Sequence, residues 1–241
     1  MVRPLGWVAA GGLGVGVVFL SLVYVTGGND MRRLVDLGLS LSRSCDSKGA
    51  TASERRLAWN GGDTINIALP ATVHYSGGLG DEVIVRGAPD VVARVEVHGS
   101  RITLDCRGGS RAVDITLPGR VFRQIGLSGS GKVLMENVMQ PDLTLTISGS
   151  GSLRAQGSVE RATVSISGSG DARLADLAVK QLTVKVSGSG DIEAAPKDLA
   201  DITLSGSGKV RLLTRPAQLR SHVSGSGRIS QPPLESADGK T

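Results

Sequence analysis

The sequence predicts an all-β protein: a parallel, right-handed β-helix or solenoid with coils of about 19 residues, preceded by an N-terminal transmembrane helix. Three observations predict this architecture. The tetrapeptide Ser-Gly-Ser-Gly occurs six times, at intervals of 20, 19, 20, 18 and 19 residues. Apolar and polar residues alternate on both sides of the copies, as they do in half-buried strands. A run of 21 uncharged residues near the N-terminus predicts the helix.

The uncharged run extends from Leu5 to Val25 and follows the positive charge of Arg3. At about 1.5 Å per residue it is long enough to cross a bilayer core of roughly 30 Å. It is longer than the apolar core of most signal peptides, so residues 1–28 are interpreted as an uncleaved anchor. The body then lies in the periplasm or on the cell exterior. The alternative is a signal peptide cleaved after Gly27, which would release the body into the periplasm.

The rest of the chain divides into a spacer at 29–54, a solenoid domain at 55–230 and a flexible tail at 231–241. Before the first tetrapeptide, strands are expected within 63–73 and 114–121, with a hairpin at 95–104 that turns at Gly-Ser. These strands form irregular first coils or a cap. The regular Ser-Gly-Ser-Gly coils extend from 123 to 230.

Aligning the six tetrapeptides reveals columns of inward-facing positions. The residue just before each copy is Leu127, Ile147, Ile166, Val186, Leu204 and Val223. Two positions earlier lie Ile125, Leu145, Val164, Val184, Ile202 and Ser221. A unit of about 19 residues cannot bury such a face alone, but stacked units bury it between them. Because the intervals vary and no glycine recurs every six residues, the right-handed form is favoured over the left-handed one.

Composition excludes several classes of function. Aromatic residues are only 2% of the chain, and the body contains just Trp59, Tyr75 and Phe122, too few for an exposed sugar or nucleic-acid platform. The net charge of +5 is spread along the chain without a basic block, so no nucleic-acid partner is expected.

Cys45 and Cys106 either form a disulfide in an oxidising compartment or remain two free thiols. No cysteine or histidine cluster has the spacing of metal ligands, and no nucleotide-binding or nucleophile motif occurs. Neither a metal, a cofactor nor a catalytic residue is therefore expected.

Two outward columns follow the tetrapeptides and carry the candidate binding residues. The first contains Asp171, Asp191 and Lys209 on successive coils, and the second contains Arg154, Arg173 and Arg211. The two carboxylates lie about 5 Å apart in a stacked solenoid, so they can bind a cation or share a proton. The arginines can follow an anionic polymer such as an acidic polysaccharide. For both columns the simpler alternative is a solvated charged surface.

Two features of the sequence are typical of a known family. The first is the coil motif, as in Ile166-Ser-Gly-Ser-Gly-Asp171 and Val186-Ser-Gly-Ser-Gly-Asp191. The second is the group of Leu-Pro strands and a hairpin that precedes the coils. Over roughly residues 55–230 the chain resembles the head GIN domain family of "putative autotransporter adhesins". The resemblance implies an exported bacterial protein with a β-helical fold, and it carries over no catalytic residue.

The leading hypothesis is therefore a non-catalytic envelope module, adhesive or structural, whose partner is an envelope polysaccharide or another envelope protein. One alternative is a polysaccharide-active enzyme that uses Asp171 and Asp191. The other is an envelope component that senses a ligand. A groove lined by the carboxylates and basic residues favours the enzyme, whereas a flat face counts against it.

Overall fold

The computed structural model describes residues 53–78, 80–105 and 112–233 of the chain. The chain splits into two compact units, Met1–Arg43 and Ser44–Thr241, and every described residue belongs to the second. No helix within these described ranges is long and apolar enough to cross a membrane.

Several predicted features lie outside the described residues. They are the membrane span at 5–25, most of the spacer at 29–54, most of the tail after 231, and both cysteines, Cys45 and Cys106. The anchor and the disulfide therefore stay predictions.

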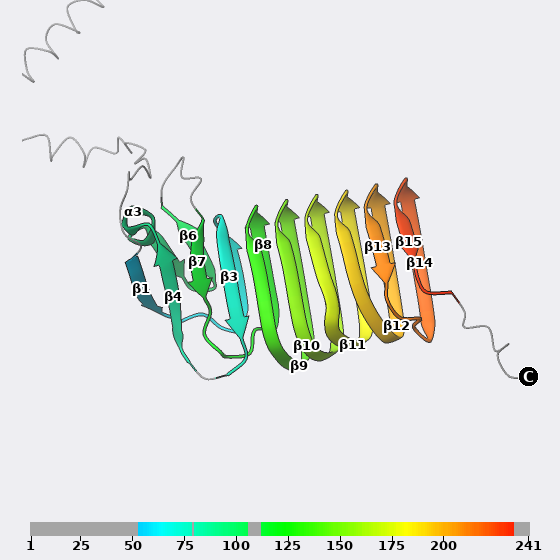
Figure 1. Ribbon diagram of the computed structural model, residues 1–241, viewed down its shortest axis with the longest axis horizontal. Coiled ribbons are helices and arrows are strands. Elements are labelled where there is room, and N and C mark those ends of the chain that lie inside the picture. The colour runs from blue at the N-terminus through cyan, green and yellow to red at the C-terminus, as the bar shows by residue number, and fades with distance from the viewer. Residues whose placement is uncertain (1–52, 79, 106–111, 234–241) are drawn as a thin grey trace, which may run out of the picture. The chain divides into compact units, whose positions relative to one another are not determined.

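The described residues form one 15-stranded sheet wound into a solenoid, with a single helical turn, α3, at Pro89–Val92 (Figure 1). The strands before the regular coils are β1 Ser53–Ala58, β2 Thr64–Ala68, β3 Ala71–Ser76, β4 Glu82–Gly87, β5 Val95–His98, β6 Arg101–Leu104 and β7 Val113–Thr116. The strands of the regular coils are β8 Gln124–Gly129, β9 Lys132–Gly149, β10 Ser152–Gly168, β11 Asp171–Gly188, β12 Asp191–Gly206, β13 Lys209–Leu212, β14 Gln218–Gly225 and β15 Arg228–Ser230.

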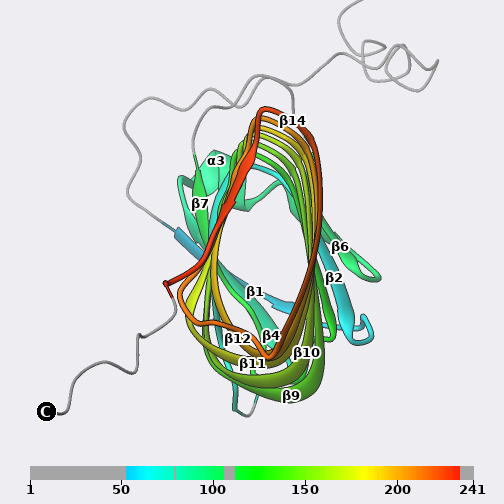
Figure 2. The same ribbon diagram turned by 90° about the vertical axis from the view of Figure 1, so that its right-hand side faces the viewer.

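Each coil has two sheet faces joined by two corners. Face A contains β3, the first halves of β9 to β12, β13 and β15; face B contains β2, β8, the second halves of β9 to β12, and β14. All these neighbours pair in parallel. Seen from the C-terminal end, the chain rises along β14, turns and descends on the opposite side while successive coils approach the viewer (Figure 2). This path is right-handed, and the predicted parallel β-solenoid is confirmed.

The core is the column structure that the sequence predicts. Leu145, Val164, Val184 and Ile202 lie over one another and are each 0% exposed. No polar or charged residue is buried anywhere in the described ranges. The stack is thus a continuous apolar interior, which the burial of aliphatic area stabilises.

The three aromatic residues of the body meet near the N-terminal end of this core. Phe122 lies edge-on to Trp59 and Tyr75, with ring centroids 5.6 and 5.8 Å apart. All three are buried. Burial raises the pKa of the Tyr75 hydroxyl above its usual value. None of the three rings is available as a binding platform.

Successive coils approach each other closely at the Ser-Gly-Ser-Gly corner. The first glycine of every copy has a positive φ, for example +121° at Gly149 and Gly168. A Cβ on Gly168 would lie 2.5 Å from the carbonyl oxygen of Gly149 in the preceding coil. The ladder continues through the corner, because the Ser169 amide donates to that same oxygen at 2.9 Å. Glycine is therefore required here by both conformation and space.

The opposite corner absorbs the differences in coil length. The parallel register is unbroken from Arg161 to Gly168 against the next coil, but it shifts between Arg154 and Gly157. A further shift separates Leu174 from Ala178. The intervals of 18 to 20 residues therefore leave the tetrapeptides aligned.

The N-terminal end of the solenoid is closed by irregular elements. Face A continues through β7 to the antiparallel strands β4 and β1. Face B continues through β2 to the β5–β6 hairpin, whose turn contains Gly99 with φ +56°. The predicted hairpin is confirmed. Helix α3 buries Val91 and Val92 against this end of the core.

On the regular coils, surface ion pairs connect residues about one coil apart. Arg161 donates to both carboxylate oxygens of Asp142, at 2.6 and 3.1 Å, and Lys180 pairs with Glu160 at 3.1 Å. The bond from Arg161 lowers the pKa of Asp142 below its usual value. Such exposed pairs add little stability, and the fold does not depend on them.

The corner geometry predicts a graded effect of alanine. Gly129→Ala, at φ +102° with open space around its Cβ, should cost only backbone strain, about 1–3 kcal/mol. Gly168→Ala should cost at least about 1 kcal/mol more, because its methyl group also collides with the preceding coil. Urea unfolding followed by circular dichroism measures both. Equal losses at the two positions would mean that coil contact does not select glycine.

The Asp142–Arg161 pair predicts an acid titration. Because the pKa of Asp142 is depressed in the folded protein, the pair stabilises the fold above the unfolded pKa of about 3.9. That stabilisation is lost as the pH falls through the folded pKa. NMR should show Asp142 titrating lower in the wild type than in Arg161→Ala. Identical titration curves in the two proteins would show that Arg161 does not lower the pKa of Asp142.

Candidate functional site

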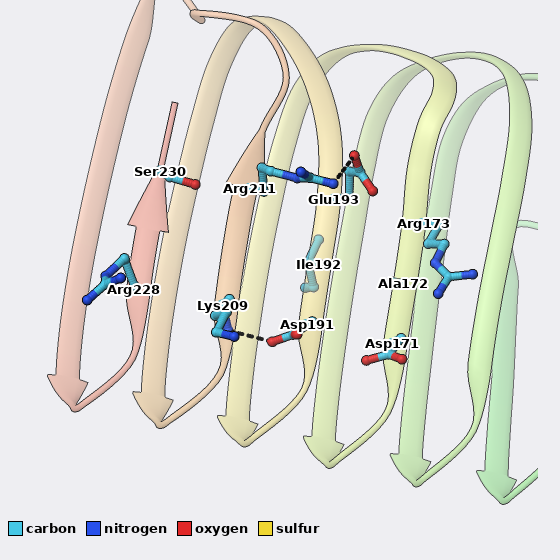
Figure 3. A pocket seen from close by; sticks show the side chains of 10 residues that line it. All are labelled: Asp171, Ala172, Arg173, Asp191, Ile192, Glu193, Lys209, Arg211, Arg228 and Ser230. Carbon is cyan, nitrogen blue, oxygen red and sulfur yellow. Dashed lines mark hydrogen bonds and ion pairs between the residues drawn. The ribbon is translucent and has the colours of Figure 1, made fainter. Parts of the chain in front are cut away.

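A charged concavity of about 400 Å³ lies on face A, over the last four coils (Figure 3). Strands β11, β12, β13 and β15 line it. Its lining residues are Asp171, Ala172, Arg173, Asp191, Ile192, Glu193, Lys209, Arg211, Arg228 and Ser230.

The coil repeat places these side chains in two rows. Asp171, Asp191, Lys209 and Arg228 follow directly after successive Ser-Gly-Ser-Gly corners and are paired in register. We call them the corner row. Neighbouring strands of a sheet are about 4.8 Å apart. The corner row therefore presents two acidic and then two basic groups along the solenoid axis, one group on each strand.

The second row starts two positions further along each strand, with its side chains on the same outward face. It contains Arg173, Glu193, Arg211 and Ser230. Between the two rows, Ala172, Ile192 and Val210 point inward and are buried. The charged side chains therefore project from strands whose opposite face packs in the apolar core.

Some charges in the concavity already have partners. Arg211 donates to a carboxylate oxygen of Glu193 at 2.8 Å, and the backbone amide of Lys209 donates to Asp191 Oδ1 at 2.9 Å (Figure 3). Across the described residues, the guanidinium groups of Arg173 and Arg228 and the ammonium of Lys209 form no ion pair. Three cations thus stay available to a ligand.

The structure brings together five of the six residues that the sequence singled out: Asp171, Asp191, Lys209, Arg173 and Arg211. The sixth, Arg154, lies outside the concavity, and its guanidinium instead pairs with Asp176 at 2.7 Å. Arg228 was missed as a binding residue, although it continues the corner row. Its position just after the sixth tetrapeptide was the signal that could have found it.

The carboxylates of the concavity lie among cations. Within the described ranges no three His, Cys, Asp or Glu side chains are grouped as metal ligands would be. Asp191 accepts a backbone hydrogen bond and lies next to Lys209, so the carboxylates face cations as well as each other. His98 is exposed and bonds Glu96 at 2.6 Å, away from the concavity.

A second hollow of about 320 Å³ lies on face B, and Ser, Thr and aliphatic residues line it. Thr146, Ser165 and Thr203 contribute from one outward row, and Ser167, Ser187 and Ser205 contribute from the tetrapeptides. Lys185 is its single charged residue. The two hollows therefore differ in character: charged residues dominate the concavity on face A, whereas Lys185 is alone among Ser, Thr and aliphatic residues on face B.

The sequence matches the family model described as "Putative auto-transporter adhesin, head GIN domain" over residues 83–216, which is more than half of the chain. The chain belongs to this family. The predicted family membership is thereby confirmed, and the family description supports an adhesin-like role at the cell envelope or surface. No curated protein matches the sequence.

Several solved structures align with this chain. A "putative adhesin" from Bacteroides fragilis aligns with a TM-score of 0.56 and 16% identity, covering 76% of this chain and 98% of its own. A "putative lipid binding protein" from Parabacteroides distasonis aligns at 0.47 and 16%, covering 77% and 98%. A "putative adhesin" from Parabacteroides merdae aligns at 0.46 and 16%, with the same coverages. At 16% identity, the alignment with the Bacteroides fragilis structure supports a shared fold and nothing about function.

Proposed function

We propose that this GIN domain is a non-catalytic adhesive module of the cell envelope that binds an acidic polysaccharide in the face A concavity. The observation that carries the proposal is the set of three unpaired cations, Arg173, Lys209 and Arg228, gathered over an inert apolar core. The predicted N-terminal anchor would hold the module at the membrane.

The spacing of the cations suits a chain of acidic sugars. Lys209 and Arg228 lie on adjacent coils, about 4.8 Å apart, and Arg173 lies two coils from Lys209. A polymer that crosses the coils meets Arg173 on β11, two carboxylates on β12, and then the adjacent cations Lys209 on β13 and Arg228 on β15, without any change in the protein. Asp171 and Asp191 can accept hydrogen bonds from sugar hydroxyl groups at the acidic end of the corner row.

The site is open, so its interactions are screened by solvent and salt. Each cation then contributes modestly, and useful affinity requires several contacts along one polymer. This is the behaviour expected of an adhesin that holds a surface by many weak contacts. A site that performs chemistry would instead exclude water from its reacting groups.

The proposal predicts which cations matter. Lys209→Ala/Arg228→Ala should weaken binding of the full chain to polygalacturonate or alginate at least about tenfold, measured by calorimetry at low ionic strength. Lys132→Ala/Lys185→Ala removes the same charge from positions outside the concavity and should leave binding nearly unchanged. Neutral dextran is the control polymer.

Wild-type affinity should fall as salt is raised, with a shallower dependence in the first double variant. Failure of the wild type to bind any acidic polymer at low salt would refute the proposal, as would equal losses in the two double variants. Release of new sugar ends that Asp171→Asn or Asp191→Asn abolishes would instead identify an enzyme.

A further inference from the structure

The C-terminal end of the solenoid exposes residues that occupy core columns. All eight residues of β14 are exposed. Val223 is 41% exposed and Leu219 is 37% exposed, whereas the residues below them in the stack, Leu204 and Ala200, are 0% exposed. The end coil therefore presents apolar side chains that every earlier coil of face B buries.

The backbone of this end is open as well. Within the described residues β14 pairs only with β12, on one side. Its other edge offers unpaired amide and carbonyl groups, which is the arrangement that recruits a further strand. The opposite end of the solenoid differs, because α3 covers it with Val91 and Val92, which are 1% and 2% exposed.

We propose that two copies of this chain associate head to head, with β14 of one copy antiparallel to β14 of the other. A twofold axis through Ser221 relates the copies. The proposal concerns assembly, and its dimer does not depend on which polymer the concavity binds.

The register follows from the order of side chains along β14. An antiparallel pair centred on Ser221 places Leu219 of each copy opposite Val223 of the other, so that the two exposed apolar residues cover each other. Centring the pair on Arg220 or on His222 would place Leu219 opposite Ser221 or Gly225 instead. Only the first register matches apolar with apolar.

Ser221 itself supports this register. It occupies a column that holds Val184 and Ile202 in the preceding coils, and it is the polar exception there. At a twofold axis it would lie opposite the same serine of the second copy, where two hydroxyl groups can bond each other. On the outward side, Arg220 faces His222 of the second copy, so arginines do not oppose each other.

The dimer has a consequence for the concavity, and this consequence alone rests on the proposed function. The axis crosses the sheet faces, so it maps face A onto face A of the second copy. The corner row ends at Arg228 on β15, the last strand of face A. The two concavities would then adjoin on one side of the dimer, and a single polymer could bind both.

A cysteine at the axis tests the register. In the full chain, with Cys45 and Cys106 replaced by serine, Ser221→Cys should form a covalent dimer under mild oxidation, because the facing Cβ atoms lie within disulfide range. Ser224→Cys is the matched control. It lies on the same exposed strand three residues from the axis, and its counterpart would be too distant to bond.

A charge at the apolar contact tests the dimer itself. Sedimentation of the full chain should show a dimer that Val223→Lys weakens at least about tenfold, while the thermal unfolding midpoint stays near that of the wild type. Leu213→Lys is the control, since Leu213 is similarly exposed, at 38%, but lies outside β14.

Three results would overturn the proposal. The first is a wild-type chain that remains monomeric at about 200 µM. The second is a Ser224→Cys variant that cross-links as well as Ser221→Cys, which would assign another register. The third is a lower thermal unfolding midpoint for the Val223→Lys variant in a protein that is monomeric. That result would mean that another segment of the same chain, such as 234–241, covers β14.

Discussion

The close stacking of glycine corners is the constraint on which the rest of this structure depends. At each corner the backbone of one coil lies directly on the backbone of the next, and the amide of Ser150, for example, donates to Gly129 at 3.0 Å. A Cβ on Gly149 would lie 2.6 Å from the Gly129 carbonyl oxygen, so a side chain there would separate the coils. Because the corners set the spacing, the apolar columns on both faces come into register, and among the described residues the core closes without a buried polar side chain.

The same constraint separates the core from the surface. Residues that alternate along a strand point to opposite sides, so every coil contributes to the core and to the outward rows at once. In β12, Ile192 is buried between Asp191 and Glu193, which both line the concavity. Adhesive chemistry can therefore be distributed over many coils while the packing beneath it stays uniform.

The repeat made most of this fold predictable from sequence. The tetrapeptides gave the coil length, and the columns that contain Leu145 and Ile147 gave the inward face. The same alignment placed five of six candidate residues in one concavity. Arg154 pairs in register with Arg173 but lies outside the concavity. Its guanidinium bonds Asp176 near the far corner, where the register shifts and sequence spacing no longer reports position. The repeat alignment also did not predict the order of strands at the N-terminal end. There β2 lies between β6 and β8, an arrangement that no local pattern specifies.

The tolerance of the far corner has an evolutionary consequence. Residues can be gained or lost there without moving the glycine stack, as the shortened turn at Ala195 and Pro196 illustrates. A whole coil can likewise be duplicated or deleted, because the new neighbours present the same columns to each other. Domains of this architecture can therefore change the length of their adhesive surface in steps of one coil, and each step adds or removes one side chain from every outward row.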